Sequence, residues 1–209
     1  LIVACAGSPR PCRSPSACAE GSECLADRCL PLGAEPVAVD SRRVVLDPVA
    51  LAVVRAGARP ESALPPTVTF GGPRHENEQL LVAFADDWGA VDVDTAFLLL
   101  EPDVAAEPTA DDVEIAVAVA AGEWRSGVAG ELPASHGPNG NGVGRTRPPA
   151  ALRIDVTALV REIAKQPRGS HGFVVRATGS SERGAVYSTG IDGPAPRLDV
   201  YFRQRPKAR

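Results

Sequence analysis

All five cysteines of the chain lie within its first 29 residues. Four of them, Cys12, Cys18, Cys24 and Cys29, follow the spacing C-x5-C-x5-C-x4-C. Zinc sites usually contain C-x2-C or C-x4-C pairs, often with histidine, and this segment contains no histidine. Two disulfide bonds fit this even set better, and disulfides persist in oxidising compartments outside the cytoplasm. The spacing therefore predicts two disulfides and leaves all three pairings open.

The fifth cysteine ends the segment Ile2-Val3-Ala4-Cys5, which resembles the lipobox of bacterial lipoprotein precursors. A branched apolar residue lies three positions before the cysteine and a small residue lies directly before it. The resemblance implies cleavage before Cys5, a lipid on Cys5, and the rest of a signal peptide upstream. No apolar run reaches the ~20 residues that span a bilayer, so we expect membrane attachment only through Cys5. The alternative is an incidental cysteine near the start of the printed chain.

The charge of the chain is unevenly distributed around its net value of −4. Residues 1–75 sum to +1, residues 76–131 to −13 and residues 132–209 to +8. Acidic and basic strands that are distant in sequence often pair in all-β folds, and their charges would then partly cancel. Alternatively, the C-terminal third forms a basic surface that meets a polyanion. The sequence favours the first interpretation and leaves the second open.

Arginines of the C-terminal third fall at positions that strand alternation turns outward. If the apolar residues of 198–202 point inward, Tyr201 and Arg203 point outward, and the same parity applies to Arg153 and Arg176. Guanidinium groups match the oxygen atoms of uronates or sulfates. We therefore predict that these four residues line a shallow face that binds an acidic polysaccharide. The alternative is a solvated sheet face whose arginines serve solubility.

Motifs for catalysis and metal binding are missing from the sequence. No serine lies in G-x-S-x-G, and H-E-x-x-H does not occur. Asp86, Asp87, Asp92 and Asp94 could hold calcium, but they lack the D-x-D-x-D-G spacing, which favours a solvated turn. We expect no enzymatic activity, no cofactor, no metal site and no nucleic-acid partner. A glycosidase-type carboxylate pair stays open, because any two acids can meet in space.

Short apolar runs broken by Pro, Gly, Asn and Asp predict strands throughout the chain after residue 35. Leu80, Val82 and Phe84 alternate with Leu81 and Ala83, which gives one well-buried face. Residues 95–101 are almost continuously apolar, as is typical of a central strand. The other predicted strands are 43–46, 51–55, 67–70, 111–120, 172–177, 185–189 and 196–203. Residues 122–149, rich in Gly, Pro and Asn, predict a long loop.

One helix of about ten residues is predicted among these strands. Apolar residues at Val156, Leu159, Val160 and Ile163 follow the i, i+3, i+4, i+7 spacing of an amphipathic helix. Asp155 is placed to cap it, and Pro167 with Gly169 ends it. Nine or ten strands with a single helix make an antiparallel sandwich.

The order of these features resembles the DNRLRE domain, which is also grouped with carbohydrate-binding module family 96. The resemblance rests on QLLVAFAD followed by TAFLLL, on IDVTALV at the start of the helix, and on the closing PRLDVYF. It covers about residues 36–203, although the family's namesake hexapeptide is not present. It implies a jelly-roll type of sandwich in a secreted or envelope protein. Some family members are similar to modules that bind acidic polysaccharides such as alginate.

The cysteine-rich segment resembles small bacterial modules that read C…C…G..C….C. This second resemblance implies an interleaved pairing, Cys12–Cys24 with Cys18–Cys29. Each bridge would contribute ~2–4 kcal/mol, which a segment with almost no core needs in order to be ordered.

The sequence thus predicts an all-β, antiparallel, jelly-roll-like β-sandwich with one short helix, preceded by a small disulfide-rich segment. The predicted parts are the end of a signal peptide with the lipobox (1–5), the disulfide-rich segment (6–30), a linker (31–35), the sandwich (36–203) and a basic tail (204–209). The expected function is that of a non-catalytic lipoprotein at the outer membrane or cell surface, carbohydrate-binding or adhesive. The alternative is a structural or protein-binding envelope scaffold without a sugar site.

Overall fold

The chain divides into two compact units, Leu1–Asp40 and Ser41–Arg209. The computed structural model describes residues 18–25, 28–31, 42–55, 63–72, 78–85, 92–103, 113–129, 135–136, 142–146, 151–165, 172–178 and 184–203.

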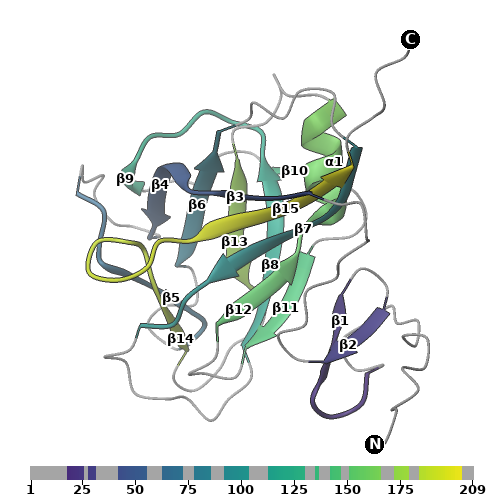
Figure 1. Ribbon diagram of the computed structural model, residues 1–209. Coiled ribbons are helices and arrows are strands. Elements are labelled where there is room, and N and C mark those ends of the chain that lie inside the picture. Colours follow the sequence, from purple (N-terminus) through teal and green to yellow (C-terminus); the bar gives the residue numbers. More distant parts are fainter. Residues whose placement is uncertain are drawn as a thin grey trace, which may run out of the picture. The chain divides into compact units, whose positions relative to one another are not determined.

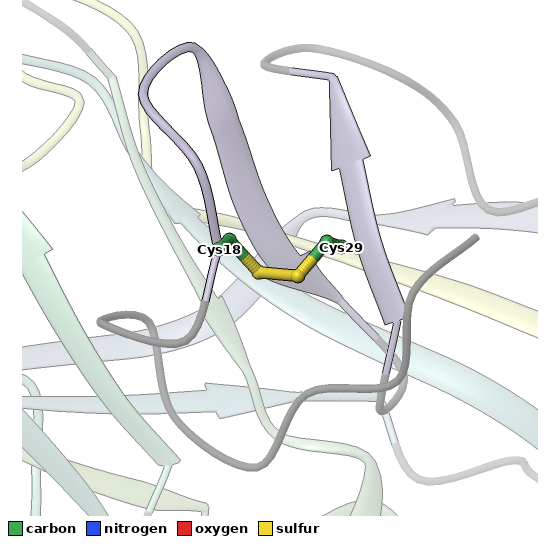
Figure 2. The surroundings of a disulfide bond; sticks show 2 residues. All are labelled: Cys18 and Cys29. Carbon is green, nitrogen blue, oxygen red and sulfur yellow. A yellow bond between two sulfur atoms is a disulfide. The ribbon is translucent and has the colours of Figure 1, made fainter.

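The first unit contains an antiparallel hairpin of β1 (Ser22–Leu25) and β2 (Arg28–Pro31). A disulfide joins Cys18, just before β1, to Cys29 on β2, and their Cα atoms are 5.4 Å apart (Figure 2). This is one of the two bridges that the resemblance to small cysteine-rich modules implies. Cys5, Cys12, the side chain of Cys24 and residues 32–35 of the predicted linker lie outside the described part.

The second unit is a sandwich of two sheets, as predicted (Figure 1). The smaller sheet has four strands, each antiparallel to its neighbours. Its order is β12 (Leu152–Asp155), β7 (Asp92–Leu100), β15 (Arg197–Arg203) and β3 (Arg42–Leu46).

The larger sheet has seven strands. Its order is β10 (Ser135–His136), β8 (Val113–Ala120), β13 (Phe173–Ala177), β6 (Gln79–Phe84), β4 (Pro48–Val54) and β9 (Gly127–Ala129), with β11 (Gly142–Thr146) also on β8. Its pairs are antiparallel except β4 with β9, which is parallel. A separate antiparallel pair consists of β5 (Thr67–Phe70) and β14 (Ala185–Ser188).

The predicted long loop at residues 122–149 is wrong in part, because β9, β10 and β11 lie within it. The described part of the second unit therefore has more strands than the nine or ten expected. These three strands contain two to five residues each. Strands this short show no apolar alternation in the sequence. They form because the backbone of a longer neighbouring strand is available to pair with them.

The core lies between the two sheets and is closed by the helix α1 (Thr157–Lys165). Leu98 of β7, Leu198 of β15, Val117 of β8 and Leu80 of β6 are all fully buried in one cluster. From α1, Leu159, Val160 and Ile163 join the same cluster, so the predicted apolar face of the helix is confirmed.

Polar groups at the start of α1 fix the helix to β7. Asp155 caps it as predicted, since its Oδ1 accepts a hydrogen bond of 2.9 Å from the Thr157 amide. The Thr157 hydroxyl in turn accepts a hydrogen bond of 2.9 Å from the Ala96 amide of β7. From the next turn, Arg161 Nε donates to the carbonyl oxygen of Val93 over 2.9 Å. Side chains of the helix are therefore hydrogen-bonded to the backbone of β7, and its apolar face shares the core cluster with Leu98 of β7.

Reduction of the disulfides should loosen the first unit and leave the second intact, because the two are separate compact units. The Cys18–Cys29 bridge spans 11 residues of chain, and closing such a loop stabilises the first unit by about 3 kcal/mol. We expect a reducing agent to speed proteolysis within residues 1–40 while the main calorimetric transition stays in place. A Cys18→Ser variant should behave like the reduced protein. Collapse of the main transition on reduction would mean that the two units unfold as one.

Candidate functional site

The outward side chains of the four-stranded sheet form three rows across its strands. These rows contain the predicted residues Arg153 and Tyr201. Strand register places Arg153, Leu99 and Arg197 in the first row, Asp155, Phe97, Asp199 and Val45 in the second, and Thr95, Tyr201 and Arg43 in the third. Most alternate residues of β12, β7 and β15 lie in the core between the sheets. Parity therefore predicted the outward direction of Arg153 and Tyr201 correctly.

Phe97 is the centre of this face and is fully buried, although it points away from the main core. The guanidinium carbon of Arg153 lies 4.1 Å from the centre of its ring, a cation–π arrangement. The ring of Tyr201 meets it edge-on, with the ring centres 6.3 Å apart. Tyr201 is only 2% exposed, so the expectation that it lines an open binding face is wrong. Its ring instead packs against Phe97 within the face.

The charges of this face are paired within the face. Asp199, also 2% exposed, accepts a hydrogen bond of 2.7 Å from Nη2 of Arg43. Its other carboxylate oxygen lies 3.9 Å from Nε of Arg197, whose Nη2 is 3.5 Å from Glu101. A buried carboxylate is costly unless cations and hydrogen bonds replace its water. Two arginines therefore act as counter-ions of Asp199.

Arg203 lies at the end of β15 and is also paired. Its Nε donates a hydrogen bond of 2.9 Å to Asp94 of β7, although the arginine side chain is 59% exposed. The pairs Arg203–Asp94 and Arg197–Glu101 join the basic C-terminal third to the acidic segment 76–131. They agree with the interpretation in which acidic and basic strands are neighbours and their charges partly cancel.

Arg176 lies elsewhere, on β13 of the larger sheet, opposite Gln79 of β6 and Ala116 of β8. It is exposed on the outer face of that sheet, on the far side of the core from the three rows. The structure therefore does not bring Arg176 together with Arg153, Tyr201 and Arg203. Alternation distinguishes inward from outward residues, but both sheets of a sandwich have an outward face. A role of Arg176 or Arg203 in binding stays a prediction.

The outer face around Arg176 contains a second apolar cluster with a tryptophan at its margin. The buried members are Ala52, Val54, Leu81, Ala120 and Val174, from four strands of the larger sheet. Trp124, half-buried, packs against them, and Val174 lies two residues before Arg176 on the same face. This is the one described place where an exposed predicted arginine shares a face with a tryptophan.

Sequence reasoning missed the residues that organise the small sheet's face, namely Phe97, Asp199 and Arg43. Phe97 lies in a run in which apolar residues occupy both parities, so nothing marks it as outward. Asp199 carried a usable signal, because it is an acid at the outward parity of a closing strand that also carries Arg197 and Arg203 there. An acid between arginines on one strand face indicates internal pairing.

Among the described residues, no three His, Cys, Asp or Glu side chains lie close enough together to hold a metal ion. Of the four aspartates considered for calcium, Asp86 and Asp87 lie outside the described part. Asp94 is paired with Arg203, and Asp92 lies at the exposed start of β7. Calcium binding by this loop stays untested.

Comparisons with protein-family models and with curated proteins return no match for this chain. No helix in the described part is both long enough and apolar enough to cross a membrane.

Replacing Asp199 with asparagine should lower the free energy of unfolding by about 1–3 kcal/mol, because it removes the carboxylate that Arg43 and Arg197 both approach. The matched control is Asp94→Asn, which breaks the more exposed pair with Arg203 and should cost less than ~1 kcal/mol. Urea titration of both variants measures the difference. Equal losses would show that burial gives Asp199 no special part in holding the face together.

Proposed function

We propose that this chain is a non-catalytic module of a bacterial cell envelope and acts as a structural or protein-binding scaffold. The observation that carries the proposal is the internal pairing of the small sheet's outer face. Arg43, Arg197 and Arg203 are engaged by carboxylates, and Arg153 lies on the Phe97 ring. A face whose charges are matched from within is rigid and has little free charge to offer a small ligand.

The envelope location is supported by the first unit. The Cys18–Cys29 disulfide suits an oxidising compartment, and the lipobox-like Ile2-Val3-Ala4-Cys5 suits a lipid anchor. Several acyl chains on one cysteine, as in bacterial lipoproteins, hold a protein firmly at a membrane. Ala6 after the cysteine, in place of Asp, suits the outer membrane or the cell surface, by resemblance to other lipoproteins. The DNRLRE-like order of elements is in keeping with such a location.

A second candidate function is adhesion to an acidic polysaccharide through the larger sheet. The observation that favours it is the exposed Arg176 on the same face as Trp124. An indole ring packs against the C–H face of a sugar, and a guanidinium group matches a uronate carboxylate. Single exposed contacts contribute only ~0.2–1 kcal/mol, so useful affinity requires many copies along a polymer.

The anchor is tested on the native precursor in its own cell. We expect intact mass spectrometry of the N-terminus to show a lipid-modified Cys5 and nothing before it. Replacing Cys5 with serine should move the protein from the membrane fraction to the soluble fraction, because no other attachment is expected. An unmodified Cys5 in membrane-bound protein would refute the lipoprotein part of the proposal.

Retention on an alginate-type matrix separates the two candidate functions. The scaffold proposal predicts weak retention. Arg176→Ala and Arg203→Ala should then reduce it equally, because each removes one positive charge from the surface. The polysaccharide candidate predicts that Arg176→Ala abolishes retention while Arg203→Ala, the matched exposed arginine on the other sheet, leaves most of it. A charge-led site must also weaken as salt rises. Circular dichroism of both variants checks that the fold is intact.

A further inference from the structure

The strand β3 is an exposed edge with an apolar surface. It is the last strand in the order β12-β7-β15-β3, and β15 is its only ladder partner among the described residues. Val44 is 39% exposed and Val45 is 48% exposed. Val49, in the irregular first part of β4, is 66% exposed. Two of the four large hydrophobic residues found exposed in the described part therefore lie next to each other on β3.

An open edge strand has unpaired backbone groups, which makes it a place where another strand can add. Charges flank the apolar part of β3 with opposite signs. Arg42 and Arg43 lie at its start, and the exposed Asp47 follows its end. Asp47 forms no ion pair with a described residue. The strand thus runs from positive through apolar to negative, and a strand with the reverse order would complement it.

We propose that β3 pairs antiparallel with β3 of a second copy of this chain, around a two-fold axis at Val45. In this register Val45 faces Val45 of the other copy. Arg43 faces Asp47 twice, and Val44 faces Leu46 twice. Residues directly opposite each other in an antiparallel pair lie on the same face and interact. Within residues 43–47 every opposed pair is therefore apolar with apolar or positive with negative, and Arg42 lies opposite Pro48. Arg43 keeps its hydrogen bond to Asp199 of its own copy through Nη2.

Symmetry favours a second copy over another partner, since a two-fold interface requires one surface that complements itself. Whether the charges that flank β3 face opposite charges of the second copy depends on the residue at which the two-fold axis lies. Centring the axis on Val44 would place Arg43 opposite Val45 and leave Asp47 without an opposed charge. With Val45 at the centre, the row containing Phe97, Asp199 and Val45 continues into the same row of the other copy. The two small sheets would then form one continuous sheet.

The interface is small, because β3 has only five residues. It falls in the class of weak, concentration-dependent contacts. A weak contact of this kind gains strength when both copies are held on one surface. The inference itself does not depend on the proposed envelope function, and it can be tested in solution.

Sedimentation equilibrium of the full chain, with Cys5→Ser in every sample to exclude cross-linking through that thiol, tests the proposal. The average mass should rise toward twice the monomer with concentration. Val45→Lys places lysine opposite lysine at the axis, and Val45→Glu places glutamate opposite glutamate. Each variant should therefore raise the dimer Kd by about tenfold or more. An equimolar mixture of the two variants should restore dimerisation, because lysine then faces glutamate.

Val49→Lys is the matched control, since Val49 is more exposed than Val45 but lies outside β3. It should leave the dimer Kd within about twofold of the unsubstituted value, as expected for a surface change away from the interface. Circular dichroism confirms that each variant is folded. A mass that stays monomeric at all concentrations, an equal effect of Val49→Lys, or a mixture that fails to dimerise would each overturn the proposal.

Discussion

Burial of β7 on both of its faces determines what the four-stranded sheet can present to a partner. Its inner residues Leu98 and Leu100 lie in the main core, while Phe97 on the outer face is fully buried as well. Polar groups beside a buried aromatic ring have little water, so they must find partners within the protein. The pairing of Asp199 with Arg43 and the contact of Arg153 with Phe97 follow from this constraint.

The same constraint changes the meaning of the arginine-rich C-terminal third. A positive segment in sequence suggests a surface for polyanions, but counter-ions decide how much of that charge is available. Here Glu101 and Asp94 engage Arg197 and Arg203 of the C-terminal third, while Asp199 of β15 engages Arg43 from the first third of the chain. Arg197 and Arg203 of the basic segment thus balance acids of the 76–131 segment on the neighbouring strand. Arg176, exposed on the other sheet, keeps a polysaccharide site under consideration.

The elements that the sequence predicted well are those whose pattern is long and local. The helix at Thr157–Lys165 shows one apolar stripe and a capping aspartate, and both are present in the structure. Strands β6, β7 and β8 were also predicted, because each is a long run of mostly apolar residues. The strands of residues 127–146 were missed, because so short a strand depends on β4 or β8 beside it. Spacing alone also left the cysteine pairing open, and Cys18–Cys29 was implied only by resemblance.

For the candidate site, the sequence predicted only which side chains point outward from their sheet. Alternation is a local property, so it gave the outward parity of Arg153, Arg176 and Tyr201. The sheet to which a strand belongs depends on distant pairing, and this separates Arg176 from the other residues. Exposure also depends on distant pairing. Tyr201 points outward yet is buried, whereas Val45, on the same face of the neighbouring strand, is half exposed. The difference is that β15 has a neighbour on each side and β3 has one. An outward residue of this sheet is therefore accessible mainly where the sheet ends, which directs the search for partners to the edge rather than to the face.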